Sequence, residues 1–405
     1  MRSIILFDDD NWSGLLPLTY TRPICELRVG ILTIREKWEF LLEGRISYIT
    51  QEYLSNKFPI EVSEDNIIIN ASILPTEALA SMIDTLPPNE AIVAGDELIA
   101  ARIPGKSFDR MVSNQEISEL KGINIEDQKD LYCQIVRPYD IFQYNSREII
   151  KDFRLITRER DFLPLSENNS SVNADQIFIE EGAQINFSIL NASDGPIYIG
   201  RDAIILEGSI LKGPCAVGAG GVIKVGAKIY QGTTIGPHCK AGGEIKESVI
   251  MAYSNKSHDG YMGNSVVGEW CNIGADTNTS NLKNNYEEVK LWNYSTGRFE
   301  KTGLQFCGLI MGDHSKCGIN TMFNTGTTIG VSCNLFGSGY HNNFIPSFTW
   351  TQPGKPATYL VEKAIESIQR MMNRKGLMFN DEDVEIMNFI YSYSGKWRTW
   401  EKRAV

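Results

Sequence analysis

Four side chains that lie close together in the sequence have the types used in acid–base and hydrogen-bonding chemistry. They are His258, Tyr261, Asn272 and Asn281. A histidine titrates near neutral pH, so it can accept a proton from a bound substrate. Asparagine amides both donate and accept hydrogen bonds, which suits them to orient hydroxyl and amine groups. The set predicts a site built around a general base, although a single histidine in a loop is more often structural.

A six-residue aliphatic repeat must position these side chains. Eight consecutive positions at this spacing are Ile199, Ile205, Leu211, Val217, Ile223, Ile229, Ile235 and Ala241. Two further runs are Tyr261, Val267, Ile273 and Thr279, and then Met311, Cys317, Phe323, Ile329 and Leu335. This period fits neither an α-helix nor an ordinary amphipathic strand. It predicts a triangular solenoid in which each hexapeptide forms one side, with its aliphatic residue inward and small residues at the corners.

The repeat has two interruptions. Residues 242–260 break the period and contain His258, and residues 281–303 form a polar and aromatic insertion. Loops that leave a rigid scaffold often carry binding and catalytic residues. The aromatic residues of the insertion are expected to pack on a neighbouring subunit, with cover for a substrate as the alternative.

The repeat resembles that of the hexapeptide-repeat acyltransferases. This resemblance implies that residues 175–350 form a left-handed parallel β-helix. The handedness comes from the family, because general topology rules favour right-handed crossovers.

The segment 256–283 resembles the acetyltransferase half of the bifunctional N-acetylglucosamine-1-phosphate uridylyltransferase/glucosamine-1-phosphate acetyltransferase family. The matching positions are His258, Tyr261, residues 272–275 and Asn281. The resemblance implies that His258 is the catalytic base and that Tyr261, Asn272 and Asn281 bind the acceptor sugar. It also implies that Ala275 and Asp313 lie near the coenzyme.

The same resemblance also implies which basic residues bind the phosphate group of the sugar. Counted back without gaps, the two basic positions of the family fall on Lys246 and Lys228. The family usually has arginine at the second position, so Lys228 keeps the charge but loses the bidentate geometry. A further family lysine corresponds to Lys283 or Lys290, and we assign Lys283 to substrate binding. Lys228 and Lys246 remain compatible with solvated surface charges.

The N-terminal residues resemble a sugar-1-phosphate nucleotidyltransferase that has lost part of its motif. The chain keeps Pro17-Leu18-Thr19 and Arg22-Pro23. Three aspartates, residues 8–10, stand where the family has a glycine-rich phosphate loop, and they would repel a triphosphate unless a cation intervened. Ile24 replaces a phosphate-binding lysine, and the segment 70–75 lacks the aspartate that binds magnesium in the family.

Two interpretations of this domain stay open. In the first, it keeps a nucleotidyltransferase fold without the catalysis. In the second, Arg22, Arg28 and Arg35 replace the lost contacts to a nucleotide such as UTP, and the acidic loop binds magnesium. Of these arginines, Arg22 and Arg28 are the predicted nucleotide-binding residues.

The remaining elements follow from apolar patterns. Short apolar runs that alternate with helical stretches predict a Rossmann-like α/β domain at residues 1–165. Residues 146–157 are expected to form the helix that leaves it, and residues 168–173 a polar linker. Apolar residues at helical spacing after Pro356 predict C-terminal helices within residues 356–405, with a second helix at 381–393.

Composition excludes several classes of protein. The net charge of -11 disfavours nucleic acid and anionic membranes as partners. The eight cysteines form no CxxC pair, which argues against a disulfide framework and a zinc site, and no metal ligands are assigned. We find no apolar run of membrane-spanning length and no secretory signal, so a cytoplasmic location is expected.

The resemblance therefore implies an enzyme that moves acetyl from acetyl-CoA to the amine of an amino-sugar 1-phosphate such as glucosamine 1-phosphate, with coupling to sugar-1-phosphate nucleotidyl transfer as a further expectation. Family resemblance implies a homotrimer with its site between subunits. Two alternatives remain: a nucleotidyltransferase whose β-helix only assembles the oligomer, and a non-catalytic protein that binds sugar nucleotides. The acyl chain, the exact acceptor and the role of residues 281–303 stay open.

Overall fold

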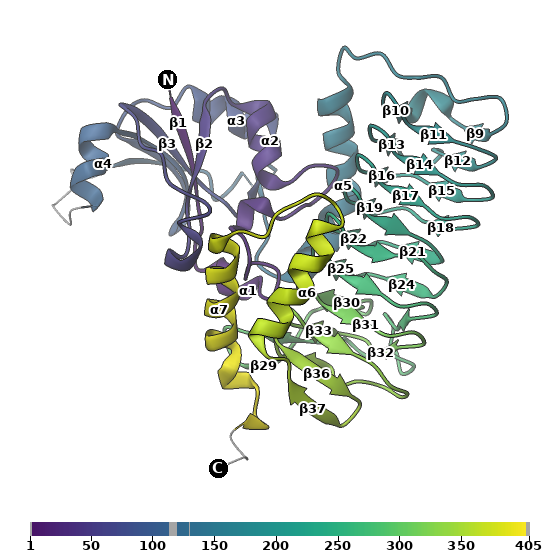
Figure 1. Cartoon of the computed structure of the whole chain (residues 1–405). Helices are drawn as coiled ribbons and strands as arrows, with labels where there is room; N and C mark the ends of the chain where they lie inside the picture. Colours follow the sequence, from purple (N-terminus) through teal and green to yellow (C-terminus); the bar gives the residue numbers. More distant parts are fainter. Residues whose placement is uncertain (1, 113–119, 129, 402–405) are drawn as a thin grey trace. The chain divides into compact units, whose positions relative to one another are not determined.

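A computed structural model of the chain describes residues 2–112, 120–128 and 130–401, without the side chains of 109–112 (Figure 1). The chain separates into two compact units. The N-terminal unit comprises Met1–Leu15, Thr21–Arg28 and Leu32–Arg137, and the C-terminal unit comprises Leu16–Tyr20, Val29–Ile31 and Pro138–Val405. The second unit therefore includes two short segments from the first part of the sequence.

The N-terminal unit is built on a mixed six-stranded sheet of order β2-β1-β3-β6-β5-β7. Its strands are β1 (Ser3–Phe7), β2 (Arg45–Ile49), β3 (Asp65–Asn70), β5 (Glu90–Ala94), β6 (Glu97–Pro104) and β7 (Lys121–Asn124). Its helices are α1 (Asn11–Gly14), α2 (Ile34–Leu41), α3 (Glu77–Asp84) and α4 (Gly105–Val112), and β4 (Ile73–Leu74) pairs with β8 (Cys133–Gln134). Strand β1 runs parallel to both β2 and β3. The predicted Rossmann-like α/β organisation is confirmed.

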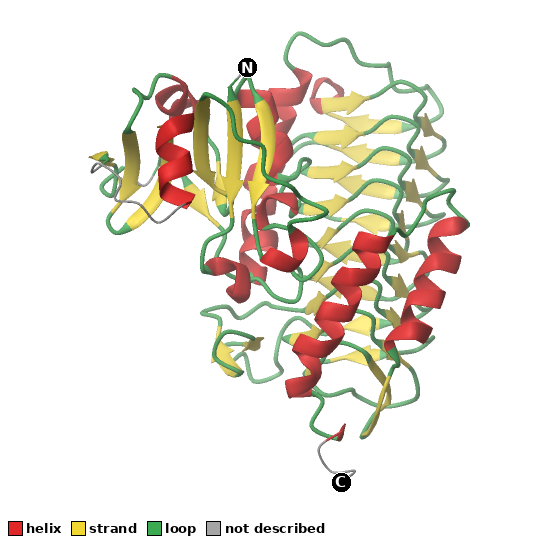
Figure 2. Cartoon of the chain, turned by 60° about the vertical axis from the view of Figure 1, so that its left-hand side comes forward, coloured by secondary structure: helices red, strands yellow, loops and turns green. Residues whose placement is uncertain are grey.

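The C-terminal unit is a left-handed parallel β-helix with three sheets (Figures 1 and 2). The first sheet contains β10 (Ile177–Ile179), β13 (Ile197–Ile199), β16 (Cys215–Val217), β19 (Thr233–Ile235), β22 (Val249–Ile250), β25 (Val266–Val267), β30 (Leu309–Met311), β33 (Thr327–Ile329) and β35 (Phe344–Ile345). The second contains β11 (Gln184–Ile185), β14 (Ile204–Ile205), β17 (Val222–Ile223), β20 (Lys240–Ala241), β23 (Asn255–Lys256), β26 (Asn272–Ile273), β31 (Lys316–Cys317), β34 (Asn334–Leu335), β36 (Thr349–Gln352) and β37 (Lys355–Thr358). The third contains β9 (Ser170–Val172), β12 (Ile189–Asn191), β15 (Ile210–Lys212), β18 (Lys228–Ile229), β21 (Glu244–Lys246) and β24 (Tyr261–Gly263). A separate pair, β27 (Asn278–Thr279) and β32 (Met322–Phe323), continues this side of the β-helix, because β27 contacts β24.

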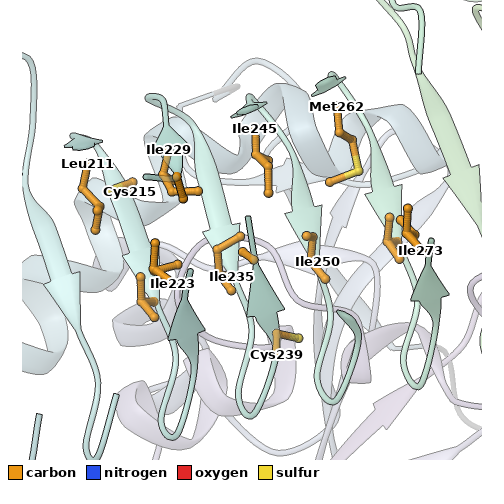
Figure 3. Close-up of a cluster of buried hydrophobic side chains, with 14 of the residues drawn as sticks. Leu211, Cys215, Ile223, Ile229, Ile235, Cys239, Ile245, Ile250, Met262 and Ile273 are labelled. Atoms are coloured by element: carbon orange, nitrogen blue, oxygen red, sulfur yellow. The ribbon is translucent and has the colours of Figure 1, made fainter. Parts of the chain in front are cut away.

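The core of the β-helix consists of the aliphatic residues that the six-residue period predicts (Figure 3). All eight positions from Ile199 to Ala241 are buried. Register stacks equivalent residues, so that Ile199 lies beside Val217 and Val217 beside Ile235. The corners need small residues, because a Cβ atom at Gly218 would lie 2.7 Å from the backbone nitrogen of Pro237.

One position of the predicted core is wrong. The period places Tyr261 inward, but Met262 occupies the core next to Ile245, and Tyr261 is only half-buried. The core residues Met262 and Val267 are only five residues apart, as are Ile245 and Ile250 one coil earlier, so a six-residue step back from Val267 falls on Tyr261. Coil length also varies: Ile210 pairs with Lys228 18 residues later, whereas Lys240 pairs with Asn255 only 15 residues later.

Residues 242–260 therefore do not leave the solenoid. They form one shortened coil with the strands β21, β22 and β23. The second predicted interruption is a true insertion, because it contains the antiparallel hairpin of β28 (Lys290–Asn293) and β29 (Arg298–Lys301).

Three helices complete the C-terminal unit. Helix α5 (Pro138–Thr157) contacts the first sheet at β16, β19, β22 and β25. Residues 168–173, expected as a linker, include strand β9, which pairs with β12. The predicted C-terminal helices are present as α6 (Val361–Asn373) and α7 (Asp381–Ser394). Among the described helices, none is long and apolar enough to span a membrane.

Candidate active site

The third sheet carries an outward-facing column of polar residues. Lys228 pairs in register with Glu244, and Glu244 pairs with Tyr261. Neighbouring strands lie about 4.8 Å apart, so these three side chains are close neighbours. Lys246 lies two residues after Glu244 and therefore projects from the same side of the sheet. The Lys228 ammonium is 4.0 Å from the Glu244 carboxylate, and the Lys246 ammonium is 3.7 Å from that of Glu247.

A chain of hydrogen bonds connects the end of this column to Asn281. The Asn281 amide donates to the Tyr261 hydroxyl at 3.1 Å and to the side-chain oxygen of Asn264 at 2.7 Å. The Asn264 amide in turn donates to the Glu247 carboxylate at 2.7 Å. Burial raises the pKa of Tyr261, so the phenol stays protonated and can donate its proton to a ligand. The network fixes two of the predicted acceptor-binding side chains relative to each other.

His258 lies in the corner loop between β23 and β24, where it is exposed. The buried Lys256 holds this loop, because its ammonium donates to the backbone carbonyls of His258 at 2.7 Å, Gly242 at 3.0 Å and Asp259 at 3.4 Å. Burial lowers the pKa of Lys256 to about 8, while Asp259 acts in the opposite direction. Lys256 is therefore a positioning residue for the loop of the candidate base.

The other predicted site residues lie elsewhere on the β-helix. Asn272 is exposed on β26 of the second sheet, in register with Asn255 and Lys316. The carbonyl of Ala275 accepts a hydrogen bond from the backbone of Asn320 at 2.7 Å. Asn272 is therefore on a different side of the triangular coil from the column of Lys228 and Tyr261, whereas Ala275 lies in the corner between β26 and β27.

Two more predicted residues make contacts within the scaffold. Asp313 is buried, and its carboxylate accepts a hydrogen bond from the backbone N–H of Glu269 at 2.8 Å, which closes a corner between coils. Lys283 donates to the carbonyl of Glu288 at 2.8 Å, within the insertion.

Three members of the polar cluster were absent from the sequence prediction: Glu244, Glu247 and Asn264. Their signal is the length of one coil. Asn264 precedes Asn281 by 17 residues, and Glu247 precedes Asn264 by the same number. One step of 17 residues back from Asn281 reaches Asn264 and a second step reaches Glu247, while one step back from Tyr261 reaches Glu244.

In the N-terminal unit, the acidic loop forms a closed hydrogen-bond network. The Asp9 carboxylate accepts hydrogen bonds from Asn70 at 2.8 Å, Ser72 at 3.2 Å and both the backbone and the side chain of Asn11. Asp8 accepts from the backbone N–H of Ile24 at 2.8 Å and from the Thr50 hydroxyl at 2.6 Å.

These contacts do not suit the proposed magnesium site. The carboxylate oxygens point at N–H and O–H donors, whereas magnesium requires oxygen ligands that are free to coordinate it. Across the described part of the chain, no group of three or more histidine, cysteine, aspartate or glutamate side chains is placed to hold a metal ion. The acidic residues instead shape the loop that replaces a glycine-rich phosphate loop.

The arginines near this loop are engaged within the unit. Arg28 is 3.4 Å from the Glu36 carboxylate, and Arg35 lies 2.6 Å from both Glu26 and Glu39. Arg22 is buried. For Arg28 and Arg35, contact with a nucleotide would compete with these ion pairs.

Replacing Asp8 with asparagine is expected to remove a pH-dependent loss of stability. Burial raises the pKa of Asp8 from 3.8 to about 7. The folded state therefore binds the proton more tightly, and its stability falls as the pH rises from about 4 to about 7. We expect a loss of about 2 kcal/mol over this window, discounted for the solvent that reaches this half-buried group.

Thermal unfolding at closely spaced pH values measures this effect. The Asp8→Asn variant keeps the acceptor for Ile24 and should show a flatter profile between pH 4 and pH 7. Parallel profiles for the variant and the native protein over this window would contradict the assignment.

Comparison with known proteins supports the relationship seen in the motifs. Residues 4–161 match the family model described as sugar nucleotidyl transferase. The bifunctional protein GlmU of Methanocaldococcus jannaschii is 39% identical over 90 residues, which cover 22% of this chain and 21% of that protein. The bifunctional sugar-1-phosphate nucleotidylyltransferase/acetyltransferase of Sulfurisphaera tokodaii is 37% identical over 93 residues, or 23% of each chain.

A longer match extends over both units. GlmU of Corynebacterium glutamicum (strain R) is 26% identical over 314 residues, which cover 67% of this chain and 62% of that protein. This chain thus spans about a fifth of the length of the first two relatives and less than two thirds of the third. Among solved structures, an Arabidopsis UDP-N-acetylglucosamine acyltransferase covers 52% of this chain and 79% of its own at 13% identity, with a TM-score of 0.23. The predicted resemblance to the bifunctional sugar-1-phosphate nucleotidyltransferase/acetyltransferase family is confirmed, with the sugar nucleotidyl transferase match at residues 4–161.

Proposed function

We propose that the β-helix transfers an acetyl group from acetyl-CoA to the amine of an amino-sugar 1-phosphate, such as glucosamine 1-phosphate. The observation that carries the proposal is the column of Lys228, Glu244 and Tyr261 and its hydrogen-bonded connection to Asn281. Two lysines on this face, Lys228 and Lys246, supply cations for a phosphate. Tyr261 and Asn281 supply hydrogen bonds for sugar hydroxyls. A structural surface has no need for this combination.

In the proposed reaction, His258 accepts a proton from the ammonium group of the sugar. The free amine then attacks the carbonyl carbon of the thioester, a new C–N bond forms, and the C–S bond breaks. Coenzyme A leaves as its thiolate and takes up the second proton, which the nitrogen loses as the amide forms. Glu244 lies in the middle of the column, where its negative charge favours a bound ammonium group over a neutral sugar.

The third sheet also supports self-association. Ile189 and Ile210 pair in register on its outer side and are 46% and 42% exposed. Apolar residues grouped on a flat sheet are typical of an interface. We infer that three copies assemble through such faces, with the acceptor site completed between them. Light scattering tests this assembly.

The assay that tests the function measures coenzyme A release from acetyl-CoA by the full chain. Release is expected with glucosamine 1-phosphate and not with glucose 1-phosphate, which has the same phosphate but a hydroxyl in place of the amine. Equal rates with the two sugars, or no release above background with either, would reject this acceptor.

A second candidate function is nucleotidyl transfer by the N-terminal unit, which the family match at residues 4–161 favours. In this case the β-helix serves only assembly. Release of pyrophosphate that depends on magnesium and UTP, without any release of coenzyme A, would favour this candidate over acetyl transfer.

A further inference from the structure

The hairpin insertion borders an open cavity, and of the site residues predicted from the sequence only Lys283 lines it. Strands β28 and β29 pair with Lys290 opposite Lys301 and Trp292 opposite Phe299. Together with the coil segment 340–344, the hairpin borders a cavity of about 1060 Å³ in the C-terminal unit. Ligand sites commonly have volumes of about 300–1,000 Å³, so this space is large enough for a sugar phosphate and a second group of similar size.

The residues that line this cavity carry positive charge, whereas the chain as a whole is negatively charged. The cavity is lined by Lys283 and Lys290, and among its described lining residues none is an aspartate or a glutamate. The protein as a whole has a net charge of -11. A local pair of cations without a neighbouring carboxylate in the wall is suited to an anion, and a phosphate group forms strong charge-assisted hydrogen bonds with lysine.

The uncharged part of the wall is rich in amides. Five asparagines line the cavity: Asn284, Asn285, Asn324, Asn342 and Asn343. Each amide offers both donors and acceptors, which is the chemistry that matches the hydroxyl groups of a sugar. The insertion and two successive coils contribute these residues, so the site exists only because the hairpin returns to the β-helix.

An aromatic surface forms another side of the cavity. Trp292 stacks on Phe344 with ring centroids 4.0 Å apart and an interplanar angle of 10°, and Phe299 contacts Trp292 edge-on at 5.3 Å. Tyr340 lines the same cavity and is 61% exposed. The pair of Trp292 and Phe344 fixes the hairpin, whereas Tyr340 leaves a ring available for the apolar face of a sugar.

Two buried polar atoms of lining residues have no hydrogen-bond partner. They are the Nε2 atom of His341 and the indole nitrogen of Trp292. His341 is only 4% exposed, and burial lowers its pKa, so the imidazole is neutral at pH 7. An unsatisfied buried polar group costs about 1–3 kcal/mol. A ligand that brings a hydroxyl group to this wall can supply the missing partner.

We propose that this cavity is a second binding site and that it takes a phosphorylated sugar. The phosphate lies against Lys283 and Lys290, and the sugar hydroxyls face the asparagines and His341. The lining contains none of His258, Tyr261, Lys228 and Lys246 and shares only Lys283 with the predicted acceptor site, so the test uses Lys290, which is not assigned to acetyl transfer. The shared chemistry is a hexose phosphate, which a free sugar phosphate and a nucleotide sugar both provide.

Calorimetric titration of the full chain tests the proposal, with glucose 1-phosphate, UDP-glucose and inorganic phosphate as probes. Lys290→Ala removes one charge-assisted contact and should weaken binding of a sugar-containing probe at least tenfold. Arg298→Ala is the matched control, because Arg298 is a cation of the same hairpin that pairs with Glu300 and does not line the cavity. Its binding should equal that of the native protein.

A third variant, Lys246→Ala, separates the two sites. The native chain is expected to show two binding events, of which Lys246→Ala loses one and Lys290→Ala the other. Stronger binding of UDP-glucose than of glucose 1-phosphate identifies a nucleotide sugar as the ligand, and the reverse order identifies the free sugar phosphate. Identical titrations of Lys290→Ala and Arg298→Ala, or binding of sugar probes no tighter than that of inorganic phosphate, would overturn the proposal. Binding that depends on Lys290 without any acetyl transfer would reject only the proposed function.

Discussion

Replacing His258 with alanine is expected to reduce coenzyme A release by a factor of about 10² to 10⁴, the usual contribution of a general base. The acceptor amine is protonated near neutral pH, and an ammonium group has no lone pair with which to attack the thioester. His258 is the exposed histidine of the corner that precedes Tyr261. Because its loop is held by Lys256 and backbone carbonyls, removal of the imidazole should leave the fold intact.

His238→Asn provides a matched control for this variant. His238 is also a corner residue of the β-helix, with a φ of 57°, and it stacks on Tyr253 at 4.9 Å. Asparagine tolerates this left-handed conformation better than alanine does. The control should retain the native rate. Added imidazole should restore part of the activity of His258→Ala, which a purely structural role would not allow. Loss of less than threefold in His258→Ala would exclude His258 as the base.

The core of the β-helix could be predicted because burial imposes a strict spacing. Each inward aliphatic residue stacks on its equivalent in the next coil, as Ile205 does on Ile223, so that the period appears directly in the sequence. The same rule fails where a coil changes length. The core residues Met262 and Val267 are only five residues apart, so a fixed six-residue period counted back from Val267 assigns the core position of Met262 to Tyr261.

The candidate site could be predicted only in part, for a similar reason. A gapless match identifies residues within one segment, such as Tyr261 and Asn281. It does not identify residues one coil earlier, such as Asn264, which touch the segment only after folding. The match also does not show on which side of the coil a residue lies. It therefore places Asn272 in one set with Tyr261, although Asn272 lies on the second sheet and Tyr261 on the third.

The role of the acidic loop depends on contacts that the sequence could not reveal. Three consecutive aspartates suggest a cation site when only their charges are considered. In the fold, Asp9 accepts hydrogen bonds from Asn70 and Ser72, more than 60 residues away in sequence. Asn70 lies near the position where the family has its magnesium ligand. Its side chain donates a hydrogen bond to Asp9, which belongs to the acidic loop that replaces the phosphate loop.

Within the C-terminal unit, hydrogen bonds between residues even farther apart in sequence hold helix α5. Asn145 takes part in most of them. Its side-chain oxygen accepts from the backbone N–H of Gly30 at 2.7 Å, and its amide donates to the carbonyl of Gly232 at 2.9 Å and to the Thr234 hydroxyl at 3.0 Å. The Thr234 hydroxyl also donates to the Gly30 carbonyl at 2.9 Å. Asn145 is fully buried, so water cannot replace these partners.

Replacing Asn145 with leucine is therefore expected to lower the free energy of unfolding by about 3–6 kcal/mol. The change leaves the Gly30 N–H and the Gly232 carbonyl without their partners, and each orphaned group costs about 1–3 kcal/mol. The network also loses the bond to Thr234, and polar networks in a low-dielectric interior tend to be worth more than separate bonds. Leucine has a similar volume, so the loss of hydrogen bonds dominates over any cavity.

Urea unfolding of the full chain measures this effect, with Gln143→Ala as the control. Gln143 is exposed on the same helix, two residues away, and its replacement should change the free energy by less than about 0.5 kcal/mol. Asn145→Asp keeps the acceptor for Gly30 but loses both donors and buries a carboxylate, so it should be at least as destabilising as leucine above neutral pH. A net contribution of about one hydrogen bond would lower the free energy of unfolding by only about 1 kcal/mol. If the free energies of unfolding of Asn145→Leu and Gln143→Ala differ by no more than this, apolar packing and not the polar network fixes the segment at Gly30 to α5.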